Sequence, residues 1–339
     1  MSDLTQYESR EGANAVSDEE FAYSQKIIKD LSDYYSSKVV GQEELRRSLI
    51  AAIIADGHIL IESVPGLAKT TAAKAISDAV DGQFSRIQCT PDLLPSDIIG
   101  TQIYHQETGK FETIFGPVFA NFVLLDEVNR SSAKTQSAML EAMQERQVTI
   151  GGVTYRMPED IFIVIATQNP IEQEGTYPLS EAQTDRFMIK ETLTYPSAAE
   201  EIRIMEMTEA KAFRKTPPVM TIRDVDLVQD IAEKVYADAA IKRYIAEIIS
   251  ATRMPGNILG KERGDYIRIG SSPRGAIAFL RIAKAAALMH GRRFVIPEDV
   301  KEMSRPVLRH RIGLTYSAYA DGVTPDDLIG ELVGKINTP

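Results

Sequence analysis

The chain lacks several features that would identify common classes of protein. It has a single cysteine in 339 residues, Cys89, so no disulfide can form within it. Cys89 lies in an apolar context, which favours a buried, unreactive thiol, and such sparse use of cysteine fits a reducing cytosol. The four histidines are scattered and show no metal-ligand spacing, which argues against a zinc site.

The chain also lacks long apolar runs and an excess of basic residues. No run approaches the roughly 18–20 apolar residues that a membrane-spanning helix needs, and the polar N-terminus has no signal-peptide core. We therefore expect a cytoplasmic protein. The formal net charge is −10. This balance argues against broad, sequence-independent nucleic-acid binding but leaves room for a local basic channel.

What the chain does have is enough apolar sequence for about two domains. Its length exceeds the ~250–300 residues at which one hydrophobic core stops growing, and 44% of its residues are hydrophobic. Residues 1–18 are polar, and we expect a disordered tail there. We expect an α/β domain with N-terminal helices over residues 19–195. Helical periodicity dominates residues 196–339, which predicts a separate helical domain.

The fold class follows from five apolar runs, at residues 58–62, 84–89, 122–126, 161–167 and 187–193. Several are nearly continuous rather than alternating, which is typical of a parallel sheet covered on both faces. Helical stretches lie between most of them, so we predict βαβ crossovers. Two hairpins are predicted at residues 100–115 and 147–156, where Thr-Gly and Gly-Gly pairs supply the turns. Such hairpins serve either as contact devices or as surface decoration.

The first apolar run leads into a candidate phosphate-binding loop. Residues 63–70 read SVPGLAKT and open an Ala-rich helical pattern. In such a junction, backbone N–H groups and the positive end of the helix dipole attract phosphate oxygens. Lys69 would reach the β- and γ-phosphates, and the Thr70 hydroxyl would help to hold Mg²⁺. Without a ligand, the same residues would be an ordinary strand–turn–helix junction.

The loop departs from the usual G-x-x-x-x-G-K-[ST] pattern at two positions. Ser63 stands at the first glycine and Ala68 at the second. Ala68 adds only a methyl group, so close approach of a phosphate can survive. Ser63 lacks the freedom of glycine at positive φ, but Pro65 and Gly66 can still turn the chain.

Paired carboxylates follow the third apolar run, at the C-terminal end of a predicted strand. Asp126 can reach Mg²⁺ directly or through water, and Glu127 can orient and polarise an attacking water. The ligand crevice of an open α/β sheet lies at these strand ends. An Asp-Glu pair could also be a solvated strand end, but its position about fifty residues after a P-loop favours a Walker B motif.

Three further side chains complete a candidate catalytic set. Asn169 follows the fourth run, where it could position the water against the γ-phosphate or simply form a turn before Pro170. Arg186 precedes the fifth run. It could stabilise charge on a transferring phosphoryl group from a neighbouring subunit, or it could pair with Asp185. Arg274 opens a helix of the second domain and could fold over the phosphates when the two domains close.

With these elements in this order, the chain resembles the AAA+ ATPases, and closely the MoxR family. The resemblance covers about residue 36 to the C-terminus. It rests on VPGLAKT (64–70), LDEVNR (125–130), KTQSAMLEAMQERQ (134–147), ATQNP (166–170), QTDRF (183–187) and SPR (272–274). It implies a five-stranded parallel AAA+ sheet with helices on both faces, followed by a helical lid domain. Residues 19–195 would then bind nucleotide, and residues 196–339 would form the lid.

The resemblance also implies a role for each motif residue. Glu127 would be the base, Asn169 the polar sensor of the γ-phosphate, and Asp126 a ligand of Mg²⁺ together with Thr70. Arg186 resembles the trans-acting arginine finger, and Arg274 the second sensor carried by the lid. The residues expected to contact ATP are Val40, Gly41, Pro65, Gly66, Leu67, Ala68, Lys69, Thr70 and Thr71. Of these, the first two match positions that contact the adenine in the family.

The departure at Ser63, where relatives usually carry glycine, bears on nucleotide affinity rather than on the fold.

The resemblance implies an oligomeric ATPase, expected as a hexameric ring, that uses ATP and Mg²⁺ to remodel or mature partner proteins in a chaperone-like manner. MoxR relatives often work with proteins that bear von Willebrand factor A domains, so such proteins are candidate clients.

Three other functions stay open at this point. One is a nucleic-acid motor, which the acidic balance and the absence of aromatic-plus-basic runs disfavour. The second is a metal-insertion subunit that resembles magnesium chelatase. The third is a nucleotide-responsive scaffold with little turnover, against which the complete set of Asp126, Glu127, Asn169 and Arg186 argues.

Overall fold

The computed structural model describes residues 16–64, 66–67, 69–158, 160–170, 176–210 and 216–339. Most of the expected tail lies outside the described residues, as do Pro65 and Ala68 of the predicted phosphate-binding loop. The first described helix is α2 (Asp18–Ser36). Ser17 caps it by accepting a hydrogen bond from the backbone N–H of Glu20, whose carboxylate bonds back to the Ser17 N–H.

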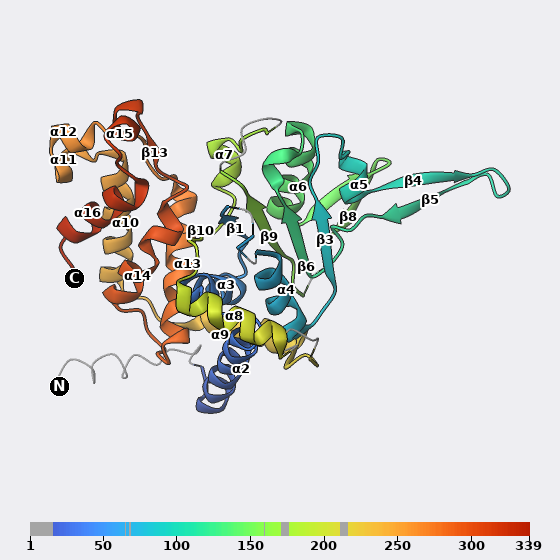
Figure 1. Ribbon diagram of the computed structural model, residues 1–339, viewed down its shortest axis with the longest axis horizontal. Coiled ribbons are helices and arrows are strands. Elements are labelled where there is room, and N and C mark those ends of the chain that lie inside the picture. The colour runs from blue at the N-terminus through green and yellow to red at the C-terminus, as the bar shows by residue number, and fades with distance from the viewer. Residues whose placement is uncertain (1–15, 65, 68, 159, 171–175, 211–215) are drawn as a thin grey trace.

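Five parallel strands form the central sheet, as predicted (Figure 1). In order across the sheet they are β10 (Ile189–Thr192), β1 (Ile59–Glu62), β9 (Ile163–Gln168), β6 (Phe122–Asp126) and β3 (Phe84–Gln88). Each neighbouring pair is parallel. The residues that follow β1, β6 and β9 therefore meet at one edge of the sheet, which we call the carboxyl edge.

Burial on both faces explains the continuous apolar runs in these strands. All five residues of β6 are buried, and so are the first five of β9. Ile59 and Ile61 join one core cluster, whereas Leu60 joins another on the opposite face. The helices α3 (Glu43–Ile54) and α4 (Lys69–Ala79) contribute to the first cluster, and α6 (Ala133–Glu145) contributes to the second.

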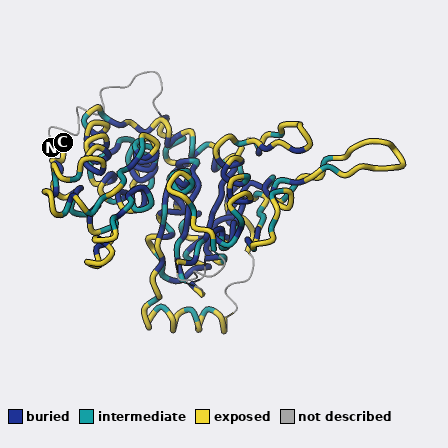
Figure 2. The backbone as a smooth tube through the Cα atoms, turned by 90° about the horizontal axis from the view of Figure 1, so that it is seen from above, coloured by how far each residue is buried: buried dark blue, intermediate teal, exposed yellow. Residues whose placement is uncertain are grey.

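Both predicted hairpins are present. The first pairs β4 (Gly100–His105) with β5 (Lys110–Phe115) after the short helix α5 (Pro95–Ile99), and it extends far from the body of the molecule (Figures 1 and 2). The second pairs β7 (Gln147–Ile150) with β8 (Val153–Arg156). Its turn residues Gly151 and Gly152 have φ of +58° and +84°, which two glycines adopt at little cost.

Helices dominate the chain after β10. They are α8 (Ala198–Glu209), α9 (Ile222–Lys234), α10 (Ala239–Arg253), α11 (Gly256–Leu259), α12 (Lys261–Gly264), α13 (Pro273–Met289), α14 (Pro297–Leu308), α15 (Tyr316–Ala320) and α16 (Pro325–Lys335). The last seven gather on one side of the sheet (Figure 1). No described helix combines the length and the apolar sequence that crossing a membrane requires.

Short elements complete the fold. They are η1 (Val128–Arg130), α7 (Glu181–Thr184), β2 (Val80–Asp81), β11 (Met220–Thr221), β12 (Ile267–Ile269) and β13 (Gly313–Leu314). β11 pairs with β2, and α9 packs against α2 and α3. The start of the helical half is therefore packed on the N-terminal helices, and α13 and α14 also reach back to contact α3 and β10.

Candidate functional site

The phosphate-binding loop joins β1 to α4 in the predicted strand–turn–helix order. Gly66 has φ of +86°, a conformation that glycine adopts at little cost. Lys69 begins α4 and is buried, and its ammonium donates a hydrogen bond of 3.2 Å to the Ser63 carbonyl. Ser63 is not among the described non-glycine residues with positive φ, so serine stands there without backbone strain.

Thr70 and Asp126 face each other at the carboxyl edge. Thr70 Oγ1 lies 3.4 Å from Asp126 Oδ2, and the other carboxylate oxygen accepts a hydrogen bond of 2.8 Å from the Thr167 hydroxyl. Hydroxyl and carboxylate oxygens are ligands that Mg²⁺ prefers, and it usually takes one or two carboxylates together with phosphates and water. The pair therefore fits a magnesium ion that is bound along with nucleotide phosphates.

Arg86 of β3 belongs to this site, and the sequence analysis missed it. Its Nη2 lies 2.6 Å from Asp126 Oδ2, and its Nε lies 3.2 Å from the same oxygen. The guanidinium thus compensates the charge of a carboxylate that is largely buried. The sequence did hold one clue to this role: an arginine within a predicted core strand needs an oppositely charged partner.

Glu127 is held by several neighbours. Its backbone has φ of +58°, an uncommon conformation for a residue with a side chain, and its N–H donates to the Thr167 hydroxyl at 2.9 Å. Its carboxylate accepts hydrogen bonds from Gln88 Nε2 and Arg130 Nη1, each at 3.1 Å. Both donors contact Oε2, and neither contacts Oε1, the second oxygen that can accept a proton from water.

Asn169 lies at the carboxyl edge, directly after β9. It is buried, and its backbone carbonyl oxygen accepts a hydrogen bond of 3.2 Å from Asn129 Nδ2. Its position agrees with a sensor of the γ-phosphate, and that role stays a prediction.

Val40 and Gly41 lie between α2 and α3. Val40 is buried, and Gly41 has φ of +65°. The carboxylate of Glu200, from α8, fills the space that a Cβ on Gly41 would need. The Gln42 side chain donates to the Thr194 carbonyl at 3.1 Å. The predicted adenine contacts therefore lie beside the start of α8.

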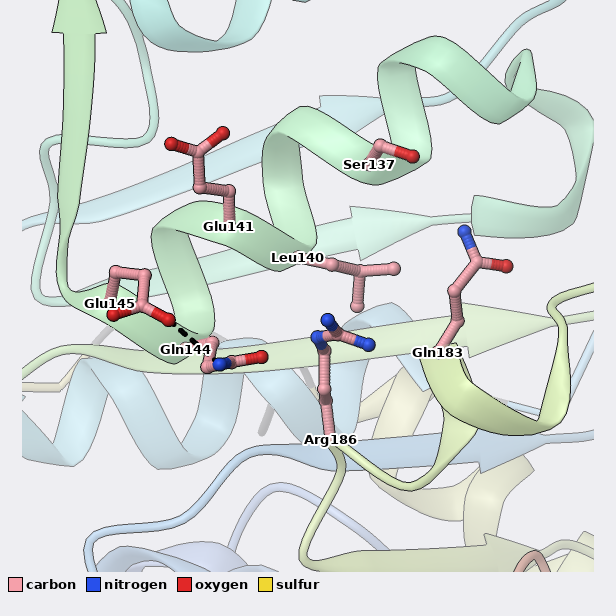
Figure 3. Close-up of a pocket in the computed structure, with 7 residues that line it drawn as sticks. All are labelled: Ser137, Leu140, Glu141, Gln144, Glu145, Gln183 and Arg186. Atoms are coloured by element: carbon pink, nitrogen blue, oxygen red, sulfur yellow. Dashed lines mark hydrogen bonds between the residues drawn. The ribbon is translucent and has the colours of Figure 1, made fainter.

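Arg186 lies toward the opposite edge of the sheet. It precedes Ile189, which pairs with Ile59 at the start of β1, whereas Lys69 follows the end of β1. A four-residue strand is about 13 Å long, so Arg186 lies away from its own phosphate-binding loop. Figure 3 shows its side chain pointing toward α6, between Gln144 and Gln183.

The side chain of Arg186 is only partly satisfied. Its Nη1 donates to the Ala182 carbonyl at 2.6 Å, while its buried Nε has no hydrogen-bond partner among the described residues. The alternative ion pair with Asp185 is not formed, because Asp185 bonds to Arg311 at 2.8 Å instead.

Arg274 lies beside Arg186 rather than beside Lys69. The two arginines line the same surface pocket. Ser272, the cap of α13, donates a 2.7 Å hydrogen bond to Asp185 and so fixes the start of α13 to the segment before β10. The guanidinium of Arg274 is exposed and has no partner among the residues that the structure describes. The expectation that Arg274 folds over the phosphates when the two domains close stays a prediction.

Two buried titratable residues are structural. Burial raises the pKa of the Cys89 thiol to about 12, which confirms the expected inert cysteine. Burial lowers the pKa of His58 to about 4. The neutral ring of His58 accepts a hydrogen bond from the Val164 N–H at 3.1 Å and lies 3.1 Å from the Met143 carbonyl.

Comparisons with known proteins agree with this site. Residues 58–189 match the family model described as "ATPase family associated with various cellular activities (AAA)", and residues 263–332 match an AAA lid domain. The chain is 44% identical to Chaperone MoxR1 of Mycobacterium tuberculosis over 305 residues, 89% of this chain and 79% of that protein. It is 30% identical to Protein MoxR of Paracoccus denitrificans, over 85% of this chain and 89% of that protein.

One solved structure extends the likeness over the whole fold. The crystal structure of a "putative ATPase" from Cytophaga hutchinsonii has 44% sequence identity and a TM-score of 0.88, and the match covers 99% of both chains. The matched AAA and lid segments, the relatives named MoxR and the motif residues at the carboxyl edge all agree. The chain belongs to the MoxR family of AAA+ ATPases.

Proposed function

We propose that the protein binds and hydrolyses ATP and uses the cycle to remodel or mature partner proteins in a chaperone-like manner. The observation that carries the proposal is the convergence of Lys69, Thr70, Asp126 and Glu127 at the carboxyl edge, with Thr70 Oγ1 3.4 Å from Asp126 Oδ2. A P-loop lysine, a magnesium pair and a carboxylate base are the parts that hydrolysis of a phosphoric anhydride requires. The expected compartment is the cytoplasm.

Each of these residues has a defined task. Lys69, which now bonds to the Ser63 carbonyl, would turn to neutralise charge on the β- and γ-phosphates, and Thr70 and Asp126 would hold Mg²⁺. Mg²⁺ supplies positive charge that balances the phosphates. Glu127 would orient the attacking water and accept its proton.

The second half of the site is proposed to come from a neighbouring subunit. Arg186 and Arg274 line one pocket, and the buried Nε of Arg186 has no hydrogen-bond partner among the described residues. A head-to-tail contact would bring this pair to the carboxyl edge of the next subunit. Contacts of that kind form rings when the rotation closes, which is compatible with the proposed hexameric ring.

The hairpin of β4 and β5 supports contact with a protein client. Tyr104 and Phe111 are 52% and 67% exposed, and their rings lie 5.1 Å apart on a hairpin that projects from the body (Figure 2). Aromatic side chains exposed together in this way commonly mark an interaction surface. Proteins with von Willebrand factor A domains are the proposed clients.

A trapping variant tests this function. Glu127→Gln should bind ATP without turning it over and should retain clients that a pull-down can recover. The matched variant Glu127→Gln/Phe111→Ser should keep ATP affinity and lose client recovery. Equal recovery by both variants would contradict the role of the hairpin, and ATP turnover at the wild-type rate by Glu127→Gln would contradict the assigned base.

A further inference from the structure

Helix α8 stands away from the body of the molecule. None of its residues is buried, and Figure 2 shows it as a separate, exposed coil. Glu200, Ile204 and Met207 lie on its half-buried side. On the opposite side, Ile202 and Met205 are 54% and 59% exposed. A surface helix normally turns its apolar stripe inward, so the outer stripe of α8 is unexplained within one subunit.

The helix is well defined although it packs so little. Ser197 and Glu200 form a capping box at its start. Isolated helices shorter than about 12–15 residues are only marginally stable in water, and most helical stability in proteins comes from packing of an apolar face. A 12-residue helix with two large apolar side chains facing solvent therefore indicates a missing packing partner.

The position of α8 identifies the surface that could cover it. Glu200 lies against Gly41, so α8 begins next to the predicted adenine contacts. If Arg186 and Arg274 reach that nucleotide from another subunit, the surface around them must come close to α8. Ile277 follows Arg274 by one turn of α13 and is 62% exposed.

The two surfaces are complementary in charge and in polarity. α8 carries four glutamates and one arginine, whereas the pocket beside Ile277 carries Arg186, Arg274 and Arg281. Arg281 lies seven residues after Arg274, about 10 Å further along the helix. Its guanidinium contacts Asp56 at 3.7 Å and remains about one-third exposed. Its exposed part can pair with an acidic helix while Arg274 faces a phosphate.

We propose that α8 docks on α13 of the partner subunit. Ile202 and Met205 would cover Ile277 of the partner subunit, and glutamates of α8 would pair with Arg281 of the partner subunit. This inference rests on the shared active site proposed above and adds the surface that holds the two subunits in register. The contact is head-to-tail, so α8 meets α13 and never a second α8.

Cysteine cross-linking tests the contact directly. The native Cys89 is buried, so only the introduced cysteines are expected to form disulfides. Met205→Cys and Ile277→Cys proteins, mixed with ATP and Mg²⁺ and oxidised, should give a cross-linked dimer on a non-reducing gel. Each protein alone should stay monomeric on the gel, and the double variant should give a ladder. Met254→Cys, equally exposed at 62%, replaces Ile277→Cys as the control and should give no cross-link with Met205→Cys.

The outcomes separate this contact from the shared site. Ile202→Glu should raise the protein concentration needed for ATP-dependent assembly by tenfold or more, while Ile114→Glu on the exposed hairpin should leave it unchanged. Cross-linking of Met205→Cys with itself, or none in the mixture, would overturn the docking of α8. If mixing Lys69→Ala with Arg186→Ala still restores activity in that case, the shared site stands and only the α8 contact fails.

Discussion

Replacing Arg86 by alanine tests whether its guanidinium and Mg²⁺ compete for Asp126. Arg86 Nη2 lies 2.6 Å from Asp126 Oδ2, the same oxygen that faces Thr70. Hydrogen bonds to charged groups contribute about 1.5–3 kcal/mol. Because the Arg86 side chain is 49% exposed, solvent screening reduces this value, and we expect about 1–2 kcal/mol.

If Mg²⁺ binds Asp126 Oδ2 directly, it would displace this contact in the wild-type protein, whereas Arg86→Ala has no such contact to displace. The ratio of ATP affinity with Mg²⁺ to ATP affinity in EDTA should therefore rise by about 5–30-fold in the variant, which corresponds to 1–2 kcal/mol. Taking the ratio removes any direct effect of Arg86 on the phosphates. Isothermal titration measures both affinities, and Arg86→Lys, which keeps the charge, should give a ratio close to wild type. An unchanged ratio in Arg86→Ala would refute the competition.

Three further outcomes are expected. Lys69→Ala should lose tight ATP binding while its circular dichroism stays native, because the charge facing the phosphates is gone; unchanged affinity by titration would remove the P-loop assignment. Glu127→Gln should bind ATP yet hydrolyse it ~10²–10⁴-fold more slowly, which phosphate release measures, because an amide cannot accept the proton of water. Burial lowers the pKa of His58 to about 4 in the folded protein, whereas the ordinary pKa of histidine is about 6.5. Between these two pH values the unfolded chain binds a proton that the folded protein does not. The free energy of unfolding therefore falls by up to about 3 kcal/mol as the pH drops from about 6.5 to 4. His58→Gln should lose that share of the pH dependence in denaturant titrations, and an unchanged pH profile would count against it.

The sequence predicted the parts of the fold that depend on local pattern. The five strands lie at the predicted runs, and the most continuous of these, in β6 and β9, are the strands buried on both faces. The hairpins lie where glycines allow positive φ, at Gly109 and at Gly151–Gly152. Asp126, Thr70 and Asn169 reach one edge because strand direction alone determines where the ends of parallel strands meet.

What the sequence could not predict depends on contacts between distant segments. Arg86 joins the site only because β3 lies beside β6, which brings it to Asp126. Thr167 links Asp126 and Glu127 through one hydroxyl, a role that its place in the ATQNP motif did not indicate. The placement of Arg274 follows from the bond between Ser272 and Asp185, which no spacing in the chain records.

The active site shared between subunits is tested most directly by mixing two inactive proteins. Arg186→Ala should bind ATP nearly normally and hydrolyse it poorly, whereas Lys69→Ala should not bind it tightly. In a mixed assembly, an intact phosphate-binding loop from one subunit meets an arginine from the next. An arginine acting in trans can contribute about 10³–10⁵ in rate, so partial restoration of phosphate release is measurable. Restored turnover is the predicted result. No restoration, with both proteins folded and present in the same assemblies, would contradict the shared active site.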